Sequence, residues 1–165
     1  MMAAKIVSTR TEIMPALRFI GKRCLCDPAD FVAKWNEWLE KGWFDQLGKL
    51  GAAPENGDAY LGGGGGDGYG FVYWIGLLFP AGAPVPDGFE YADVPAAKYI
   101  AFEVSGKKAG ELSGEEVHLL CTDEMRKRDL TQLNKGWGFE RYRSLGQAVP
   151  GENNFAFFEW LTSIE

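Results

Sequence analysis

The sequence predicts an α+β domain in which two β-α-β-β units, joined near Asp87-Gly88, form an antiparallel sheet with two helices. An internal repeat is the main observation behind this prediction. The pattern apolar-Pro-Ala-x-base-aromatic-Ile occupies positions 14–20 (MPALRFI) and recurs 80 positions later at 94–100 (VPAAKYI). The aromatic segment 71–77 (FVYWIGL) matches 155–161 (FAFFEWL) 84 positions later. Recurrence of several blocks at nearly one spacing indicates that a single unit has been duplicated.

The first unit is expected to run strand, helix, strand, strand. Positions 14–24 have the aromatic and β-branched content of a strand, with a proline tolerated at its start. A helix is expected to begin at Asp27-Pro28, as N-cap and first helical residue. Its core-facing stripe recurs every four residues: Phe31, Trp35, Leu39, Trp43 and Leu47. Gly42 is expected to kink or end this helix, and strands at 59–61 and 70–79 complete the unit.

The second unit repeats this order. Positions 89–105 read as extended chain with a proline at an edge or bend. Ser113 and Glu116 form a capping box that opens a helix. The helix has a moderate apolar face made of Val117, Leu120, Cys121 and Met125. Strands near 139–143 and 155–164 close the unit.

Composition excludes several classes of protein. The 165 residues are 46% hydrophobic and 14% aromatic, which suits one domain at 1–165 with half-repeats at roughly 12–86 and 87–165. With 17 basic against 23 acidic residues, the net charge of −6 disfavours binding to a phosphate backbone. The first residues lack a signal peptide's apolar core, and no apolar run reaches the ~20 residues that span a bilayer. Three cysteines, an odd number, fit a reducing compartment. We therefore expect a cytoplasmic protein without nucleic-acid or membrane partners.

Two patterns resemble cofactor sites and are interpreted otherwise. The segment 63–68 (GGGGDG) satisfies G-x-G-x-x-G, but a strand follows it, so no helix N-terminus is available for a pyrophosphate. Cys24, Cys26, His118 and Cys121 contain the atoms of a Cys₃His zinc set, but C-x-C is not zinc-finger spacing. We predict a hairpin loop, free thiols, no metal and no cofactor.

One residue of the last strand conflicts with its surroundings. Both faces of the strand at 155–161 are apolar except at Glu159. At the repeat spacing of 84 its counterpart is Ile75, so the fold itself does not require an acid there. A carboxylate in an apolar setting needs a partner or a raised pKa. Two interpretations stay open: an internal ion pair with Arg141, Arg143 or a lysine, or a functional role as an anchor for ligand cations or as a base.

Taken together, these segments resemble a known family. The paired Pro-Ala-x-Lys/Arg-aromatic strands, FVYWIG at 71–76, GFEY to VPAAKY over 88–99 and FEW at 158–160 are similar to the GyrI-like small-molecule-binding domain. This domain is also called the effector-binding domain of bacterial transcription activators. The resemblance extends from about Met14 to the C-terminus. It implies two β-α-β-β units of SHS2 type around a pseudo-twofold axis, with a central aromatic pocket and a glutamate at its floor.

The resemblance also implies site residues. Glu159 matches the pocket-floor glutamate, and Tyr73 and Trp74 belong to the aromatic strand that faces the pocket. Further residues implied to line the pocket are Phe157, Trp160, Trp137 and Tyr142. Only about thirteen residues precede the first expected strand, too few for a DNA-reading module, so we expect the domain to stand alone.

Two functions follow from the resemblance. The first is a binder of hydrophobic, aromatic, often cationic compounds, whose rings stack on Tyr73, Trp74 and Trp160 while Glu159 neutralises the polar end. The acidic stretch 51–97, which lacks lysine and arginine, favours cations as ligands. The alternative is a cyclopropanoid cyclopropyl hydrolase with Glu159 as the general base for water and Tyr73 as a hydrogen-bond donor. A protein partner such as gyrase is a third hypothesis, and haem binding is disfavoured by the single histidine.

Overall fold

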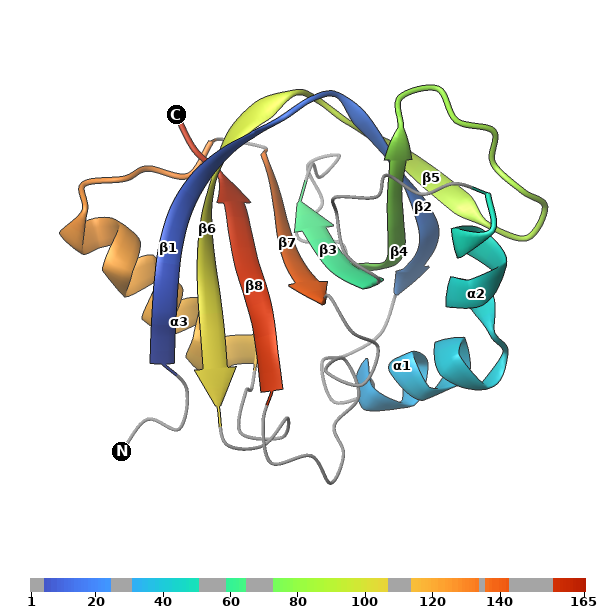
Figure 1. The fold of residues 1–165 in the computed structure, drawn as a ribbon, viewed down its shortest axis with the longest axis horizontal. Coiled ribbons are helices and arrows are strands. Elements are labelled where there is room, and N and C mark those ends of the chain that lie inside the picture. The colour runs from blue at the N-terminus through green and yellow to red at the C-terminus, as the bar shows by residue number, and fades with distance from the viewer. Residues whose placement is uncertain are drawn as a thin grey trace.

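The computed structural model describes residues 5–24, 31–50, 59–64, 73–106, 114–133, 136–142 and 156–165, and it has an α+β fold (Figure 1). The first unit contains β1 (Lys5–Met14), β2 (Leu17–Cys24), α1 (Phe31–Glu40), α2 (Trp43–Gly48), β3 (Ala59–Gly64) and β4 (Tyr73–Pro80). The second unit contains β5 (Glu90–Val94), β6 (Ala97–Gly106), α3 (Gly114–Lys127), β7 (Trp137–Tyr142) and β8 (Ala156–Ser163). The predicted antiparallel sheet, with helical segments between the strands of each unit, is confirmed.

The repeated Pro-Ala motifs lie where two long strands bend. β1 and β2 are the arms of one bent strand, and β5 and β6 are the arms of the other. The bent strands pair antiparallel in a single register: Leu17 lies opposite Val94 on one side of the bend, and Met14 lies opposite Ala97 on the other. Proline has no N–H for a ladder, so pairing is interrupted at the bend itself. The two copies of the motif therefore face each other across a pseudo-twofold axis, at the arch in Figure 1.

The sheet shows that the two units exchange their first strands. Its eight strands have the order β1-β6-β8-β7-β3-β4-β2-β5. This order reads the same backwards when every strand is replaced by its counterpart in the other unit. One half-sheet is β1-β6-β8-β7 and the other is β3-β4-β2-β5, so each takes its outer strand from the other unit. The half-sheets join where β3 pairs with β7.

Two local features differ from the sequence expectation. The helix expected from Asp27 onward is divided into α1 and α2 because Gly42 adopts a left-handed conformation with φ of 65°. The described chain therefore has three helices where two were expected. The sequence also does not predict β1, because its outward side chains blur the apolar alternation, and Ile13 is 82% exposed. The helix starts predicted at Asp27 and Ser113 lie outside the described residues.

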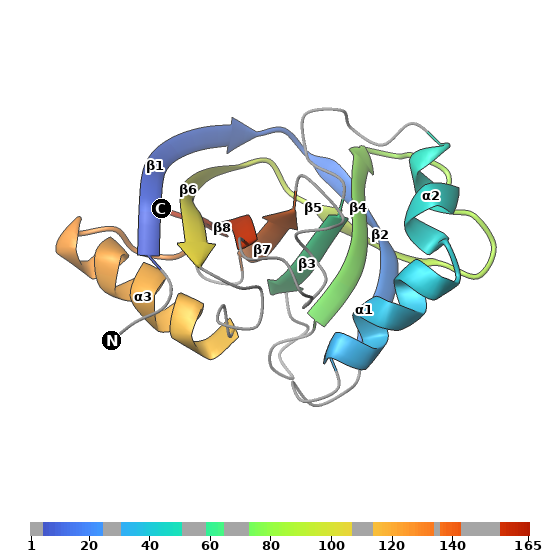
Figure 2. The same cartoon turned by 60° about the horizontal axis from the view of Figure 1, so that its bottom comes forward.

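The curved sheet has a helix-covered face and an inner face, and successive side chains of a strand alternate between them (Figure 2). α3 flanks one half-sheet, where His118 contacts Trp160 of β8. Three side chains of α3 are buried: Val117, Cys121 and Met125. α1 and α2 flank the other half-sheet and bury Trp35, Trp38, Phe44 and Leu47. Among the helices that the structure describes, none is long and apolar enough to cross a membrane.

A pair of glycines brings β2 and β4 unusually close together. Gly21 lies opposite Gly76 in the ladder, and both positions belong to the inner face. A Cβ atom on Gly21 would lie 2.8 Å from the Gly76 Cα and would overlap the Ile75 carbonyl oxygen. A Cβ on Gly76 would likewise overlap the Ile20 carbonyl oxygen. Only glycine permits this approach of two backbones.

Candidate functional site

Aromatic rings from both units meet on the inner face. The ring centroid of Phe19 on β2 lies 5.9 Å from that of Trp74 on β4 and 6.1 Å from those of Trp137 and Phe139 on β7. Tyr99 on β6 extends the cluster at 5.9 Å from Phe139. All five side chains are buried. Separations of this size are those of packed aromatic pairs. The inner aromatic cluster, made of these five residues, therefore joins the half-sheets as core.

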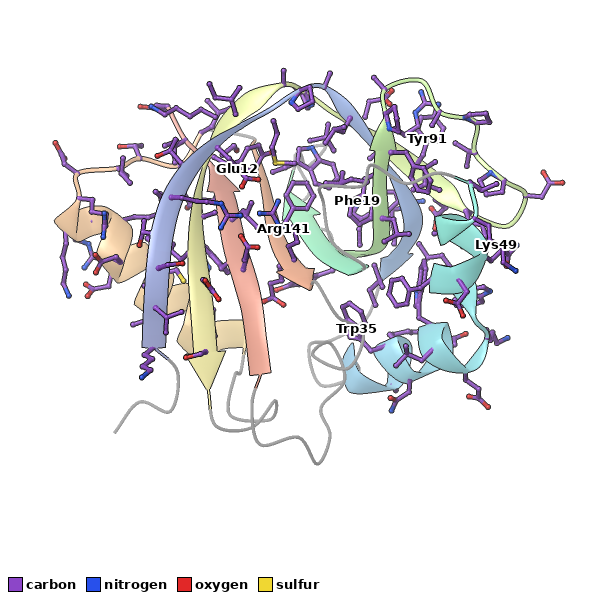
Figure 3. The ribbon with its side chains drawn as sticks, in the orientation of Figure 1. Glu12, Phe19, Trp35, Lys49, Tyr91 and Arg141 are labelled. Carbon is purple, nitrogen blue, oxygen red and sulfur yellow. The ribbon has the colours of Figure 1, made fainter. Side chains whose placement is uncertain are left out.

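Glu159 lies on the same face in a network of alternating charges. Arg141 on β7 donates hydrogen bonds to Glu159 at 2.8 Å and to the two oxygens of Glu12 on β1 at 2.8 and 3.1 Å. Figure 3 shows Glu12 and Arg141 directed toward each other. Arg10 on β1 bridges the same carboxylates, 3.0 Å from Glu12 and in contact with Glu159. The Glu159 and Arg141 side chains are 7% and 2% exposed. The internal ion pair with Arg141, one of the two interpretations left open by the sequence, is therefore present.

The network stabilises the carboxylate of Glu12 in the ionised form. Burial acts to raise the pKa of Glu12, but the hydrogen bonds and charges of Arg141 and Arg10 outweigh it, so this pKa is lowered. Tyr99 lies opposite Glu12 in the ladder, and its pKa is raised by burial and then by the charge of Glu12. Two carboxylates and two guanidinium groups balance in charge. Glu159 thus already faces two cations of its own chain.

The ladders also revise which residue of the first unit corresponds to Glu159. β4 and β8 pair with the equivalent strands β2 and β6, and these registers align Glu159 with Trp74 rather than with Ile75. Trp74 shares the inner face with Glu159, whereas Ile75 is on the helix-covered face. The inference that the fold does not require an acid at this position is unchanged.

The helix-covered face brings Trp160 next to an acid that the sequence analysis did not select. Trp160 follows Glu159 in the strand and so lies on the opposite face. There its ring centroid is 6.1 Å from that of Phe102 and 5.9 Å from that of His118 on α3. Its partner across the ladder is Glu140 on β7. Side chains directly opposite each other in a ladder are neighbours on one face. Glu140 and Trp160 are therefore adjacent beneath α3.

The charge of Glu140 acts on two further groups of this face. Burial raises the pKa of Tyr73, and the carboxylate of Glu140 raises it further. Burial also raises the pKa of the Cys121 thiol to about 12, with additional contributions from Glu140 and Glu124. Such effects require an ionised carboxylate nearby. Glu140 is half-buried, so its field is less screened than that of a surface acid.

Two glycines leave the sheet without side chains beside this group. Tyr73 lies opposite Gly63 on β3, and Gly63 lies opposite Gly138 on β7. Gly138 in turn pairs with Thr162 on β8. Two consecutive positions of this cross-strand row therefore present only backbone. The two glycines lie between Tyr73 on β4 and β8, the strand that carries Trp160. Glu140 belongs to the next cross-strand row, two residues along β7 from Gly138.

The site residues predicted from the sequence are thus divided between two faces. On the inner face lie Trp74, Trp137 and Glu159. On the helix-covered face lie Tyr73 and Trp160. The two remaining side chains, which are outside the described part of the structure, are those of Phe157 and Tyr142. The predicted Glu159 and Trp160 are neighbours in sequence but point away from each other, because strand side chains alternate.

Glu140 could not be singled out from the sequence alone. It lies in WGFERY at 137–142, where charged and aromatic residues are mixed and Glu140 stands next to another charged residue, Arg141. The signal that identifies it is its pairing with Trp160, which requires knowledge of the strand register. For metals, the described residues contain no group of three His, Cys, Asp or Glu side chains suited to an ion. The Cys24 side chain and Cys26, parts of the zinc set considered above, are not among those residues.

Comparison with known proteins shows the fold. No protein-family model matches the chain, and no curated protein matches it in sequence. The structure of SAV2435 bound to tetraphenylphosphonium superposes with a TM-score of 0.73 at 11% identity, over 96% of this chain and 94% of that one. A proposed transcription regulation protein from Staphylococcus aureus MU50 gives 0.69 at 12% identity, over 96% and 98%. The EcmrR C-terminal domain gives 0.59 at 13% identity, over 96% and 97%. The chain therefore has the fold of the GyrI-like effector-binding domain, as its sequence resemblance predicted.

Proposed function

We propose that this protein binds a hydrophobic organic cation on its helix-covered face, with Glu140 as the counter-charge and Tyr73 and Trp160 as aromatic contacts. The observation that carries the proposal is the position of Glu140, half-buried, opposite Trp160 and close enough to raise the pKa of Tyr73. Aromatic rings and a carboxylate in a poorly screened setting are the groups that attract a weakly hydrated cation.

Two further facts support a cation as the ligand. SAV2435, which shares the fold, was solved bound to tetraphenylphosphonium, a hydrophobic cation. The net charge of −6 also favours cations over anions in the field around the protein. Gly63 and Gly138, which lie opposite each other in the ladder, have no side chain that such a ligand would meet.

Glu159 is already engaged by two guanidinium groups of its own chain. Its carboxylate already accepts a hydrogen bond from Arg141 and contacts Arg10. A ligand cation would have to displace one of these guanidinium groups and leave it buried without its partner, which is costly. The role of Glu159 as an anchor stays a prediction from the family resemblance.

The hydrolase hypothesis also stays a prediction. It requires Glu159 as the base and Tyr73 as the hydrogen-bond donor for one substrate, but these side chains lie on opposite faces of the sheet. A base must reach the proton that it removes at hydrogen-bond distance. The two residues cannot meet that condition together without a change in the fold.

The proposal is tested with a pair of ions of similar shape and opposite charge. Tetraphenylphosphonium and tetraphenylborate are titrated into the wild type, Glu140→Gln and Glu159→Gln, with calorimetry as the readout and circular dichroism to verify folding. We expect the wild type to prefer the phosphonium, and Glu140→Gln to weaken its binding about tenfold, or about 1.4 kcal/mol. Glu159→Gln should retain the affinity.

Two results would contradict the proposal. Equal binding of the two ions to the wild type would show that charge does not govern recognition. Loss of phosphonium affinity in folded Glu159→Gln, with affinity kept in Glu140→Gln, would place the counter-charge on the inner face instead.

A further inference from the structure

Three aromatic rings form a box at the corner where α1 and α2 meet the edge of the sheet. Trp38 at the end of α1 and Trp43 at the start of α2 are in edge-to-face contact, with centroids 5.3 Å apart. Phe89, just before β5, lies 6.1 Å from Trp38 and 6.5 Å from Trp43. Trp38 is buried, whereas Trp43 and Phe89 are half-buried. Trp38 thus forms the floor of the box and the other two rings form its walls.

The box already holds a cation of the same chain. The ammonium nitrogen of Lys22 on β2 lies 4.1 Å from the Trp43 ring centroid and 5.2 Å from that of Phe89. A second ammonium group, that of Lys41, lies 5.5 Å from Trp43. These separations are within the range of cation–π attraction. The Trp43 ring is therefore within cation–π range of two ammonium groups, and Lys22 is the nearer of the two.

Backbone geometry holds the rings in place. Gly42, with φ of 65°, turns the chain between α1 and α2 and sets Trp43 against Trp38. Gly88, with φ of 87°, lies in a turn closed by the bond from the Phe89 N–H to the Pro86 carbonyl. Both glycines adopt a left-handed conformation that other residues reach only with strain. The backbone conformations at Gly42 and Gly88 therefore help to fix where Trp43 and Phe89 lie.

The chemistry of the box suits a quaternary ammonium ion better than the lysine in it. Within the described residues, neither Lys22 nor Lys41 has a carboxylate at salt-bridge distance. A primary ammonium has three N–H donors that aromatic faces satisfy poorly. A trimethylammonium group has none and is more weakly hydrated, so it gives up less on entering an aromatic cage. From this geometry we propose that Trp38, Trp43 and Phe89 form a second binding site, for small quaternary ammonium groups, in which Lys22 is the internal competitor.

This site is separate from the one proposed around Glu140. Lys22 and Glu140 lie in one row across the helix-covered face, with β4 and β3 between their strands. Three strand spacings separate them, or about 14 Å. Among the described residues no carboxylate pairs with the lysines at the box, so the proposed recognition of the cation there depends on its rings. The two proposals therefore stand or fall independently.

The experiment compares choline with 3,3-dimethylbutan-1-ol, its neutral carbon analogue, by NMR titration of the full chain. Ring currents should place the ε-methylene protons of Lys22 upfield in the free wild type. Choline should move this signal toward the position of a solvated lysine as Lys22 leaves the box, and the alcohol should not. Lys22→Ala should bind choline about tenfold more tightly than the wild type, because the competitor is gone. Lys41→Ala, the matched control, should change the affinity less, because Lys41 is exposed and farther from the ring.

Removal of a wall should abolish binding. In the Lys22→Ala background, Trp43→Leu should lose choline affinity, and Phe89→Leu provides the same test if Trp43→Leu does not fold. The proposal is wrong if choline leaves the Lys22 signal in place and Lys22→Ala binds no more tightly than the wild type. Equal binding of the neutral alcohol would also overturn it, because the box would then be only an apolar hollow. Glu140→Gln should leave choline binding unchanged, which separates this result from the test of the phosphonium site.

Discussion

The two half-sheets use equivalent positions for different purposes. One cross-strand row on the helix-covered face contains one residue from each of six neighbouring strands. The pseudo-twofold axis passes through the middle of this row and relates its two halves. Its three equivalent pairs, first unit before second, are Lys22 and Phe102, Ile75 and Trp160, and Leu61 and Glu140. The backbone has kept its symmetry, but only the second unit has an acid beside the axis and a tryptophan next to it. Since the first unit packs with leucine and isoleucine at the equivalent positions, the fold itself does not require Glu140 and Trp160 there.

The inner face differs between the units in the same way. Glu159 and Arg141 form the buried half of the charge network, and their register equivalents in the first unit are Trp74 and Gly62. The first unit thus has one aromatic ring and one glycine at the positions where the second unit has two ions. A buried ion network costs desolvation that packed rings avoid. The following predictions concern substitutions at positions where the two units differ. They are given in order of the expected loss of stability, beginning with the largest.

Gly21 should be the position least able to accept the residue of its counterpart. The pair Gly21–Gly76 corresponds to the pair Ala101–Leu161 in the second unit, so the counterpart of Gly21 is Ala101. Gly21→Ala puts a Cβ into the Ile75 carbonyl oxygen, and no side chain can move aside to relieve the overlap. We expect a loss above about 4 kcal/mol in urea unfolding, or no folded protein. The reciprocal control, Ala101→Gly, should cost only about 1 kcal/mol, and similar losses in the two variants would show that the close approach is not required.

Arg141→Met should have the next largest effect. It removes the guanidinium group that pairs with the carboxylates of Glu12 and Glu159 on the inner face, so we expect a loss of about 3–5 kcal/mol at pH 7 in urea unfolding. Arg126→Met, which breaks an exposed pair with Asp123, should cost less than about 1 kcal/mol.

The same variant should change the response to acid. Because the pKa of Glu12 is lowered from its ordinary value of 4.5, the stabilisation is complete above that pH and is lost as pH falls through the lowered value. The wild type should therefore lose stability over the interval from pH 4.5 down to the lowered pKa of Glu12. Arg141→Met should show a weaker decline over this interval, and an unchanged decline would mean that Arg141 does not govern the titration of Glu12.

Gly42→Ala should have the smallest effect of the three. The helix of the first unit is divided at Gly42, whereas α3 continues unbroken over Gly114–Lys127. A Cβ on Gly42 meets no atom within 4 Å, so the cost comes from the left-handed backbone alone, about 1–2 kcal/mol. Thermal unfolding followed by circular dichroism measures this loss. A stabilised variant would show that α1 and α2 can merge into one helix, as α3 does.

Much of the fold follows from the sequence for identifiable reasons. The Pro-Ala repeats marked the bends because proline interrupts a ladder at the same place in both units. Gly42 was recognisable as a break because few other residues adopt its φ. The first strand was not predicted, since β1 exposes Ile13 and Val7 and buries only Met14. Propensity and periodicity both depend on burial that only the tertiary structure reveals.

The site was harder to predict than the fold. Selecting Glu159 as an acid in an apolar strand was sound, and the structure confirms that it is buried and paired with Arg141. In the observed strand register, Trp160 and Tyr73 lie on the opposite face of the sheet from Glu159, so the three side chains do not form one group. The neighbour of Trp160 is Glu140, which is twenty residues earlier in the chain. Which residues share a face across strands depends on register, and a one-residue shift moves every side chain to the other side.

The exchanged first strands carry an evolutionary consequence. In a single ancestral unit with this topology, the first strand would have extended away from the other three strands. The outer position of that unit's own half-sheet would then have been empty. The unit could fill that gap only with the arm of a second copy, which is a swapped homodimer. Fusion of two gene copies would turn that partnership into one chain, and each copy could then diverge without having to fit an identical twin. The acid at the axis is a residue that a symmetric dimer would have been obliged to carry twice, as two like charges facing each other.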